Sequence, residues 1–353
     1  MSILDRVRPD LAGFVPYASA RRTGLVAPTR LDANESPWPH DDAAPLNRYP
    51  EPQPAALRDA LARLYGVRSD QLWIGRGSDE AIDLLVRAFC RAQRDNIVSI
   101  VPTFGMYKVA ARLQGANWRE LPLRADEDFA LDPVRLLACV DDDTRIVVLC
   151  SPNNPTGTCH HAHIETLARA LHGRALLLVD EAYIEFSDSK SAASLIDRYD
   201  NLAVLRTLSK AHALAGARIG ALLASAPLVA LVSAIAAPYP VSTPCTVAAL
   251  RALEPVALAE TMRRVTTLVA ERNRLAAALA ASPAVSQVWP AAGNSLLVRW
   301  HDAARSFARL LGAGVLVRDV SAQTGLDGCL RISVGSPAQN DQVLAALGGR
   351  IAA

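Results

Sequence analysis

The sequence predicts an α/β protein with a mainly parallel sheet, followed by a smaller α+β unit. Short apolar runs alternate with amphipathic helical segments from about residue 55 to residue 240, which is the pattern of a parallel sheet covered by helices. The chain of 353 residues is long enough for a large core and more often forms two domains than one. Hydrophobic residues make up 51% and charged residues 20% of the chain, which excludes a disordered protein.

Six apolar runs predict the strands of the parallel sheet. They cover residues 72–74, 96–101, 145–150, 175–179, 202–205 and 219–224. Between the first two runs, four apolar residues have the i, i+3, i+4, i+7 spacing of one helix face, namely Ile82, Leu85, Val86 and Phe89. Proline ends the second run and follows the third, because it cannot donate a hydrogen bond to a neighbouring strand.

Beyond Pro244 the sequence predicts the smaller unit. A long stretch rich in alanine and mixed in charge, roughly 246–281, predicts a helix. Three apolar runs predict strands, at residues 296–298, 315–317 and 329–333. The first 45 residues are rich in Pro, Asp and Arg and are expected to cross another surface. We therefore expect a large domain over 46–245 and a small domain made of 1–45 and 246–353.

Charge, cysteine spacing and hydropathy narrow the class of protein. The net charge is only +2 and no basic run occurs, so nucleic acid is not expected as a partner. The six cysteines lack CxxC spacing and are expected to be reduced thiols of a cytoplasmic protein. The first residues lack the continuous apolar stretch of a secretory signal. Every apolar run is broken well before about 18 residues, so no membrane span is expected.

Three reactive side chains stand where apolar runs end. Lys210 follows the run at 202–205, and Asp180 follows the run at 175–179, with Tyr183 close behind. A carboxylate that ends a fully apolar strand is unfavourable unless it is paired. Together the three residues could hold pyridoxal phosphate (PLP), with the lysine on its aldehyde, the acid facing the ring nitrogen and the phenol facing the ring oxygen. A structural ion pair, a packed tyrosine and a surface lysine are the alternatives.

Two turns rich in small and polar residues follow predicted strands. Gly77-Ser78-Asp79 stands between the first strand and its helix, where glycine lets the backbone approach an anion that the first helical N–H groups can bind. An ordinary capped turn is the alternative. In the string 151–157, Ser-Pro-Asn-Asn-Pro-Thr-Gly, Asn154 lies just beyond a parallel strand, where ligand crevices open. Proline and asparagine also suit a simple turn.

Donors for an anion flank Lys210. Small residues follow the lysine, which favours desolvation and a lowered pKa of the amine, the condition for nucleophilicity. Arg218 offers a bidentate donor to a phosphate, and Thr207 and Ser209 offer hydroxyls to the same anion. Farther along the chain, Arg331 interrupts an apolar strand and requires a carboxylate partner, either a protein group or a substrate.

The cluster Cys159-His160-His161-Ala162-His163 contains residue types that bind zinc. Adjacent residues rarely converge on one ion with tetrahedral geometry. We therefore expect a solvated helix start at this cluster, and no metal site.

Taken together, these strings resemble the fold-type I PLP-dependent aminotransferases, over a span from Tyr17 to beyond Arg331. Further matches are residues 31–37 (Leu-Asp-Ala-Asn-Glu-Ser-Pro), residues 47–50 (Asn-Arg-Tyr-Pro) and Phe104, where the family often has a tyrosine. The resemblance implies a large domain with a mainly parallel seven-stranded sheet plus a smaller α+β domain. Within the family, the match is to enzymes that act on histidinol phosphate.

The resemblance also implies a role for each matched residue. Lys210 would carry PLP as a Schiff base and move a proton once it is released, with Asp180 and Tyr183 as the other catalytic residues. Asp180 would keep the ring nitrogen protonated, Asn154 and Tyr183 would bind the ring oxygen, and Phe104 would stack on the ring. The phosphate would be held by Gly77, Ser78, Asp79, Thr207, Ser209, Arg218 and Tyr49 of the partner subunit.

Substrate contacts are implied for Tyr17, Arg22, Asn34, Asn154 and Arg331. Arg331 would bind the α-carboxylate of glutamate or the phosphate of histidinol phosphate. The implied activity is ping-pong amino transfer by a cytoplasmic homodimer, which interconverts histidinol phosphate plus 2-oxoglutarate and imidazole-acetol phosphate plus glutamate.

Three other activities remain open from the sequence. An aromatic amino-acid aminotransferase of the same subfamily would share every cofactor residue and differ near Tyr17, Arg22 and Tyr107. A PLP-dependent decarboxylase of phosphothreonine would use the same architecture. A regulator would use the same domain as a sensor.

Overall fold

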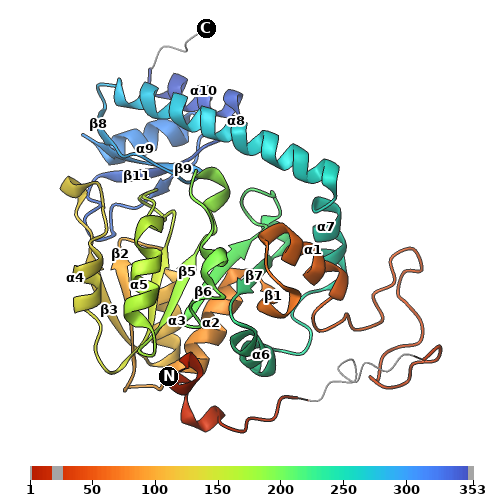
Figure 1. Cartoon of the computed structure of the whole chain (residues 1–353). Helices are drawn as coiled ribbons and strands as arrows, with labels where there is room; N and C mark the ends of the chain where they lie inside the picture. Colours follow the sequence, from red (N-terminus) through yellow and green to blue (C-terminus); the bar gives the residue numbers. More distant parts are fainter. Residues whose placement is uncertain (1, 18–26, 349–353) are drawn as a thin grey trace.

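The computed structural model describes residues 2–17 and 27–348. Two sheets organise the chain: a seven-stranded sheet with helices on both faces, and a four-stranded sheet with its own helices (Figure 1). This arrangement confirms the α/β class, with a mainly parallel seven-stranded sheet and a smaller α+β unit. The long helix α8 (Pro255–Ala280) runs across the top of Figure 1, from the small sheet to the side of the large one.

The large sheet has the strand order β1-β7-β6-β5-β4-β2-β3. The strands from β6 to β3 pair in parallel, whereas β7 runs antiparallel to both of its neighbours. The strands are β1 (Leu72–Arg76), β2 (Asn96–Val101), β3 (Asn117–Pro122), β4 (Thr144–Cys150), β5 (Leu176–Asp180), β6 (Leu202–Thr207) and β7 (Ile219–Leu223).

The edge strand β3 was not among the six predicted runs. Its sequence, Asn-Trp-Arg-Glu-Leu-Pro, is mostly polar, and only Leu121 is buried in it. An edge strand has a neighbour on one side only and is partly open to water, so it does not need the continuous apolar run of a central strand.

Both faces of the large sheet are buried, because successive side chains of a strand point to opposite faces. In β4, Val147 and Leu149 belong to one core cluster, and Ile146 and Val148 belong to the other. This double burial explains the near-continuous apolar runs of the central strands. Helices α1 (Ala55–Tyr65), α4 (Pro133–Ala138) and α5 (Ile164–Leu171) pack on the first face, and α2 (Ser78–Phe89), α3 (Met106–Gln114) and α6 (Ala226–Ile235) on the second.

The small sheet is antiparallel and has the order β10-β11-β9-β8. It packs against α8, and the remaining elements of this unit are β8 (Val285–Val288), β9 (Ser295–Trp300), α9 (Ala303–Gly312), β10 (Arg318–Asp319), β11 (Cys329–Ser333) and α10 (Pro337–Ala346). The strands expected at 296–298 and 329–333 are confirmed, and β8 is an addition.

The strand expected at 315–317 is wrong. Gly314 has φ +80°, and the N–H of Val315 donates to the carbonyl of Leu310. This hydrogen bond and the left-handed conformation of Gly314 close the end of α9. The backbone at Val315 therefore caps a helix, and pairing with β11 begins only at Arg318.

The single helix expected over roughly 246–281 is in fact two helices, α7 (Thr243–Ala252) and α8. The break falls at Leu253 and Glu254, directly before Pro255. Proline lacks an N–H and disfavours a helical conformation in the residue before it, but it fits the first turn of a new helix.

The start of the chain packs on the large sheet's helical layer. Ile3 is 1% exposed and belongs to the core cluster that contains α2. The N–H of Arg8 donates to the carbonyl of Ala88, near the end of the same helix.

The division into domains at 45/46 and 245/246 stays a prediction.

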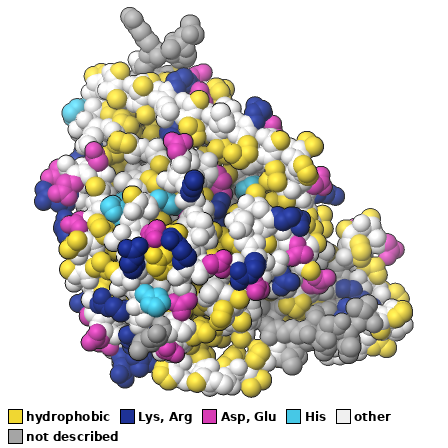
Figure 2. Space-filling model, viewed as in Figure 1, with side chains coloured by type: hydrophobic (Ala, Val, Ile, Leu, Met, Phe, Trp, Pro, Cys, Tyr) yellow, Lys and Arg dark blue, Asp and Glu magenta, His cyan; other side chains and the backbone are white. Residues whose placement is uncertain are grey.

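Three features of the described chain bear on its class: the surface charge, the lengths of the apolar helices and the state of the cysteines. On the face shown in Figure 2, Lys and Arg side chains are interspersed with Asp and Glu. Within residues 2–17 and 27–348, no helix combines the length and the apolar character that crossing a bilayer requires. All six cysteines are free thiols, and Cys90, Cys150 and Cys329 are buried.

Candidate active site

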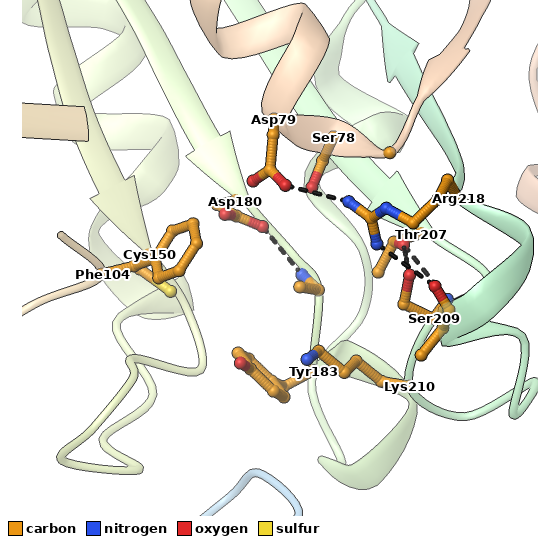
Figure 3. A pocket seen from close by; sticks show the side chains of 13 residues that line it. Ser78, Asp79, Phe104, Cys150, Asp180, Tyr183, Thr207, Ser209, Lys210 and Arg218 are labelled. Carbon is orange, nitrogen blue, oxygen red and sulfur yellow. Dashed lines mark hydrogen bonds and ion pairs between the residues drawn. The ribbon is translucent and has the colours of Figure 1, made fainter. Parts of the chain in front are cut away.

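The carboxyl ends of β4, β5 and β6 and the turn after β1 surround one cavity, because the ends of parallel strands meet at the same edge of a sheet. The cavity has a volume of about 560 Å³, which includes space open to solvent. Every predicted cofactor residue except Asn154 and Tyr49 lines it. The lining residues are Gly77, Ser78, Asp79, Phe104, Cys150, Asp180, Ala182, Tyr183, Thr207, Ser209, Lys210, Ala215 and Arg218 (Figure 3).

One end of the cavity is suited to an anion. Helix α2 begins at Ser78, so its first N–H groups have no partner within the helix. Arg218 Nη2 donates to Asp79 Oδ2 at 3.0 Å. Thr207 Oγ1 donates to Ser209 Oγ at 3.0 Å. Figure 3 shows these hydroxyls, the guanidinium and the helix start on the same side of the cavity.

Two glycines make this close approach of backbones possible. A Cβ on Gly220 of β7 would lie 2.2 Å from the backbone nitrogen of Ser78. A Cβ on Gly77 would lie 2.5 Å from Arg218 Nη2, and Gly77 has φ +81°. Both positions therefore require glycine. The sequence pattern indicated Gly77, whereas Gly220 lies inside an apolar strand and gave no separate signal.

Asp180 lies at the other end of the cavity and is 3% exposed. Tyr107 donates its hydroxyl to Oδ2 at 2.7 Å, and the N–H of Ala182 donates to Oδ1 at 3.0 Å. Burial raises the pKa of Asp180 to about 6, although the hydrogen bond from Tyr107 acts in the opposite direction. In the described part of the chain, no Lys, Arg or His forms an ion pair with Asp180. A cation entering the cavity would therefore compensate the desolvated carboxylate.

Tyr107 has a role that the sequence did not reveal. We expected it near the substrate, but it is 1% exposed and its hydroxyl contacts Asp180. Its ring also meets Phe104 edge-on, with centroids 5.5 Å apart. The sequence offered only a weak signal for this contact, since Phe104 stands just before α3 and Tyr107 is the second residue of that helix.

Lys210 reaches the open side of the cavity, where its Nζ lies 5.5 Å from the ring centroid of Tyr183. The lysine as a whole is exposed at the cavity mouth. Desolvation of the amine by the cavity walls, followed by the positive charge of Arg331, nevertheless lowers its pKa. A lowered pKa increases the fraction of free amine that can react with a carbonyl.

A chain of hydrogen bonds connects Tyr183, which lines the cavity, to the small sheet. Arg331 Nη1, from β11, donates to Asn154 Oδ1 at 2.6 Å, and Asn154 Nδ2 donates to the Tyr183 hydroxyl at 3.2 Å. The Nε of Arg331 is buried without a hydrogen-bond partner. The observed partner is thus an amide, and no carboxylate within the described residues pairs with Arg331. Its charge remains available to an anion.

The remaining predicted residues lie elsewhere in the chain. Asn34 and Tyr49 line a second cavity, together with residues 242–244, and the ring of Tyr49 stacks on Tyr239 with centroids 4.6 Å apart. Tyr17 is 71% exposed. Arg22 falls outside the described residues.

The helix start expected at 159–163 is confirmed, because a short 3-10 helix, His161–His163, leads into α5, but the expectation that it is solvated is wrong for His160 and His161. His160 is 1% exposed, and the ring of His161 contacts Ser151 and Glu181 at 2.8 and 3.0 Å. The ends of β4 and β5 supply these two partners, which the local sequence around the histidines could not indicate. Among the residues that the structure describes, no group of His, Cys, Asp or Glu is arranged to hold a metal ion.

The cavity fits PLP in the chemistry of its groups. Among the described residues the carboxylate of Asp180 has no cationic partner, and the helix start, the hydroxyls and Arg218 form an anion site. Lys210 and Tyr183 stand beside the space between the carboxylate and the anion site (Figure 3). A planar ring with a cationic nitrogen, a phosphate and an aldehyde would satisfy all three regions.

Comparison with known proteins identifies the family to which this cavity belongs. The chain matches the family of class I and II aminotransferases over residues 17–347. It is 56% identical to a histidinol-phosphate aminotransferase of Xanthomonas campestris pv. campestris (strain B100), over 98% of this chain and 97% of the relative. A solved histidinol-phosphate aminotransferase from Sinorhizobium meliloti, in complex with pyridoxal-5'-phosphate, has a TM-score of 0.77 and 27% identity over 96% of each chain. A solved L-threonine-O-3-phosphate decarboxylase from Porphyromonas gingivalis has a TM-score of 0.73 and 25% identity, over 86% of this chain and 90% of that one.

The first prediction concerns Gly220. Replacing Gly220 by alanine places a methyl group against Ser78 and displaces the start of α2, so we expect PLP to bind at least about tenfold more weakly, equivalent to roughly 1.4 kcal/mol. Gly216→Ala is the matched control, because nothing lies within 4 Å of the added Cβ. Titration of the cofactor-free proteins with PLP measures the effect. Equal affinity of the two variants would contradict this account of the turn.

The second prediction concerns the pH dependence of the cofactor-free protein. A raised pKa in the folded state means that stability is present below the unfolded pKa near 3.8 and is lost as pH rises through about 6. The free energy of unfolding of Asp180→Asn should therefore rise relative to that of the wild type by about 3 kcal/mol between pH 3 and 8. Urea unfolding midpoints across this range provide the measurement, with the exposed Asp42→Asn as control. A constant difference between wild type and Asp180→Asn would refute the effect.

Proposed function

Because the chain belongs to the class I and II aminotransferase family, we propose that it interconverts histidinol phosphate plus 2-oxoglutarate and imidazole-acetol phosphate plus glutamate. The family is PLP-dependent. The observation that carries the choice of substrate is the near-full-length similarity to relatives named histidinol-phosphate aminotransferases. Over such a span the similarity covers both the cofactor cavity and the small sheet that supplies Arg331.

PLP, when bound, supplies the aldehyde that takes up the amino group and the ring that delocalises negative charge. Lys210 is the group that binds this aldehyde and, once free, moves the proton at the substrate carbon. Its lowered pKa supports this role, since a neutral amine accepts a proton. Asp180 holds a proton at the ring nitrogen, and Tyr107 orients the carboxylate through its hydroxyl.

The other cavity residues orient the ring. Asn154 and Tyr183 already share a hydrogen bond, so both can turn a donor toward the ring oxygen, and Phe104 provides an aromatic face. At the anion end, the phosphate is bound by Gly77, Ser78, Asp79, Thr207, Ser209 and Arg218. Asp79 acts there by orienting Arg218, with which it is paired.

Arg331 is the substrate's anion site. Its guanidinium has a buried unpartnered Nε and an amide as its only described hydrogen-bond partner. It can therefore donate hydrogen bonds to the α-carboxylate of glutamate. Histidinol phosphate has no carboxylate, and its phosphate takes the same place. Asn154, also predicted as a substrate residue, acts in this proposal by positioning the guanidinium of Arg331 through their hydrogen bond.

The working unit in this proposal is a cytoplasmic homodimer. Tyr49 lies outside its own chain's cavity, which suits a tyrosine that reaches the phosphate in the neighbouring subunit. Asn34 lies beside it, and Tyr17 and Arg22 belong to the segment that closes over the substrate. Six free cysteines are in keeping with a reducing compartment.

Attachment of the cofactor is tested with Lys210→Ala. The visible absorption band of the lysine-bound cofactor should disappear in this variant, whereas Lys190→Ala, an exposed lysine, should keep it. The chain has only three lysines, so borohydride reduction followed by peptide mass mapping assigns the label without ambiguity. Label on Lys108 or Lys190 would overturn the assignment.

Substrate choice is tested by the half-reaction with each amino donor. We expect kcat/KM for histidinol phosphate to exceed that for phenylalanine by at least about tenfold, or 1.4 kcal/mol. A higher value for phenylalanine would identify an aromatic amino-acid aminotransferase. Release of carbon dioxide from phosphothreonine would identify a decarboxylase. A chain that binds PLP and turns over none of the three would indicate a sensor.

A further inference from the structure

A second cluster of reactive side chains lies beside the cofactor cavity. The Sγ of Cys159 is 3.3 Å from Nδ1 of His161, and Nε2 of the same ring is 3.0 Å from Oε1 of Glu181. None of the three residues lines the cavity described above. A nucleophile, a base and a carboxylate that orients the base are the parts of a nucleophilic site.

The surroundings of Glu181 decide where the imidazole proton lies. The carboxylate is fully buried and accepts hydrogen bonds from Ser191 Oγ and from the N–H of Ala192, each at 2.6 Å. It acts as an acceptor, so Nε2 of His161 donates to it. Nδ1 then faces two groups, the Ser151 hydroxyl at 2.8 Å and the Cys159 thiol at 3.3 Å, and it can take the proton of the more acidic thiol.

Transfer of this proton is favoured electrostatically. Burial raises the pKa of Cys159, but hydrogen bonds with His161 and Ser189 outweigh this effect and lower it to about 6. Burial lowers the pKa of His161, and its bonds to Cys159 and Glu181 outweigh that effect and raise it to about 9. The other charged or titratable groups packed around the pair are Arg206 of β6, Glu185 beside it, and His160 and His163 on the same segment.

We propose that Cys159 is a site of covalent modification, a thiolate held by His161 and Glu181 that peroxides oxidise to a sulfenic acid. The sulfur attacks one peroxide oxygen, so an S–O bond forms as the O–O bond breaks. The sulfur loses two electrons and the peroxide gains them. The departing hydroxide takes the proton of the His161 imidazolium and leaves as water, and neutral His161 remains.

Cys159 differs from the other cysteines in the features that this chemistry needs. It is partly exposed, whereas Cys90, Cys150 and Cys329 are buried. Cys139 and Cys245 are partly exposed as well, but both pack against the apolar core of the large sheet, and the Sγ of Cys139 donates to the carbonyl of Arg135 rather than facing a base. Cys139 is therefore a matched internal control. The proposal uses no residue of the cofactor cavity, so it holds or fails independently of the aminotransferase activity.

Alkylation with iodoacetamide, followed by peptide mass spectrometry, tests the thiolate in the PLP-loaded protein. A thiol with the usual pKa of about 8.5 is roughly 0.3% ionised at pH 6. A pKa of about 6 would leave Cys159 about half ionised at this pH. The lower intrinsic reactivity of a less basic thiolate then leaves Cys159 a net advantage of about tenfold over such an ordinary thiol. Above pH 7 the rate at Cys159 should level off, because its thiol is then almost fully ionised.

The variant His161→Gln places an amide at this position, which can still form hydrogen bonds but cannot take up the proton. We expect the rate at Cys159 in this variant to fall at least tenfold at pH 6 and to rise steeply with pH. Cys159→Ser should remove the fast-reacting peptide altogether. A wild-type rate at Cys159 no greater than that at Cys139 at pH 6 would overturn the proposal, and this comparison needs no variant.

Oxidation is tested with hydrogen peroxide and dimedone, which traps sulfenic acids. The expected result is a dimedone adduct on Cys159 that forms at least tenfold faster than on Cys139 and is slowed in His161→Gln. Adducts spread evenly over the exposed cysteines, or absent from Cys159, would show that the cluster is only a buried polar network.

Discussion

The desolvated carboxylate of Asp180 is the constraint on which the arrangement of the site depends. It ends a strand whose side chains are buried on both faces, where an unpaired charge is strongly unfavourable. Tyr107 and the N–H of Ala182 supply two hydrogen bonds, which offset only part of the desolvation cost of this carboxylate. The packing of α3 on the sheet brings the Tyr107 hydroxyl within hydrogen-bonding distance of Asp180. The position of this helix therefore determines how far the carboxylate is stabilised.

The end of β5 serves two sites at once. Asp180 faces the cofactor cavity, whereas Glu181, the next residue, accepts bonds from Ser191 and His161. Successive side chains at a strand end point in opposite directions, so adjacent acids can act in separate surroundings. The backbone of Ser151 binds the carbonyl of Asp180 while its hydroxyl contacts His161, which connects the cavity to the Cys159 cluster.

Much of the fold could be predicted because burial leaves a direct pattern in the sequence. The central strands of the large sheet are apolar on both faces, and the four residues of the α2 face are all buried. The misses have local physical causes: β3 is a polar edge strand, Pro255 divides a helix that otherwise looks continuous, and Gly314 turns the chain after α9. Each depends on which backbone groups find partners, and hydropathy does not report this.

The chemistry of the cavity was encoded in residue type and position along the chain. Lys210, Asp180 and Tyr183 follow buried strands, and parallel strands present their ends at one edge, so their convergence could be foreseen. Only the folded chain decided which groups touch: Tyr107 rather than a basic residue on Asp180, Asn154 on Arg331, and the backbone of Gly220 against Ser78. These contacts join residues far apart in the chain, and their distances follow from how helices and sheets pack.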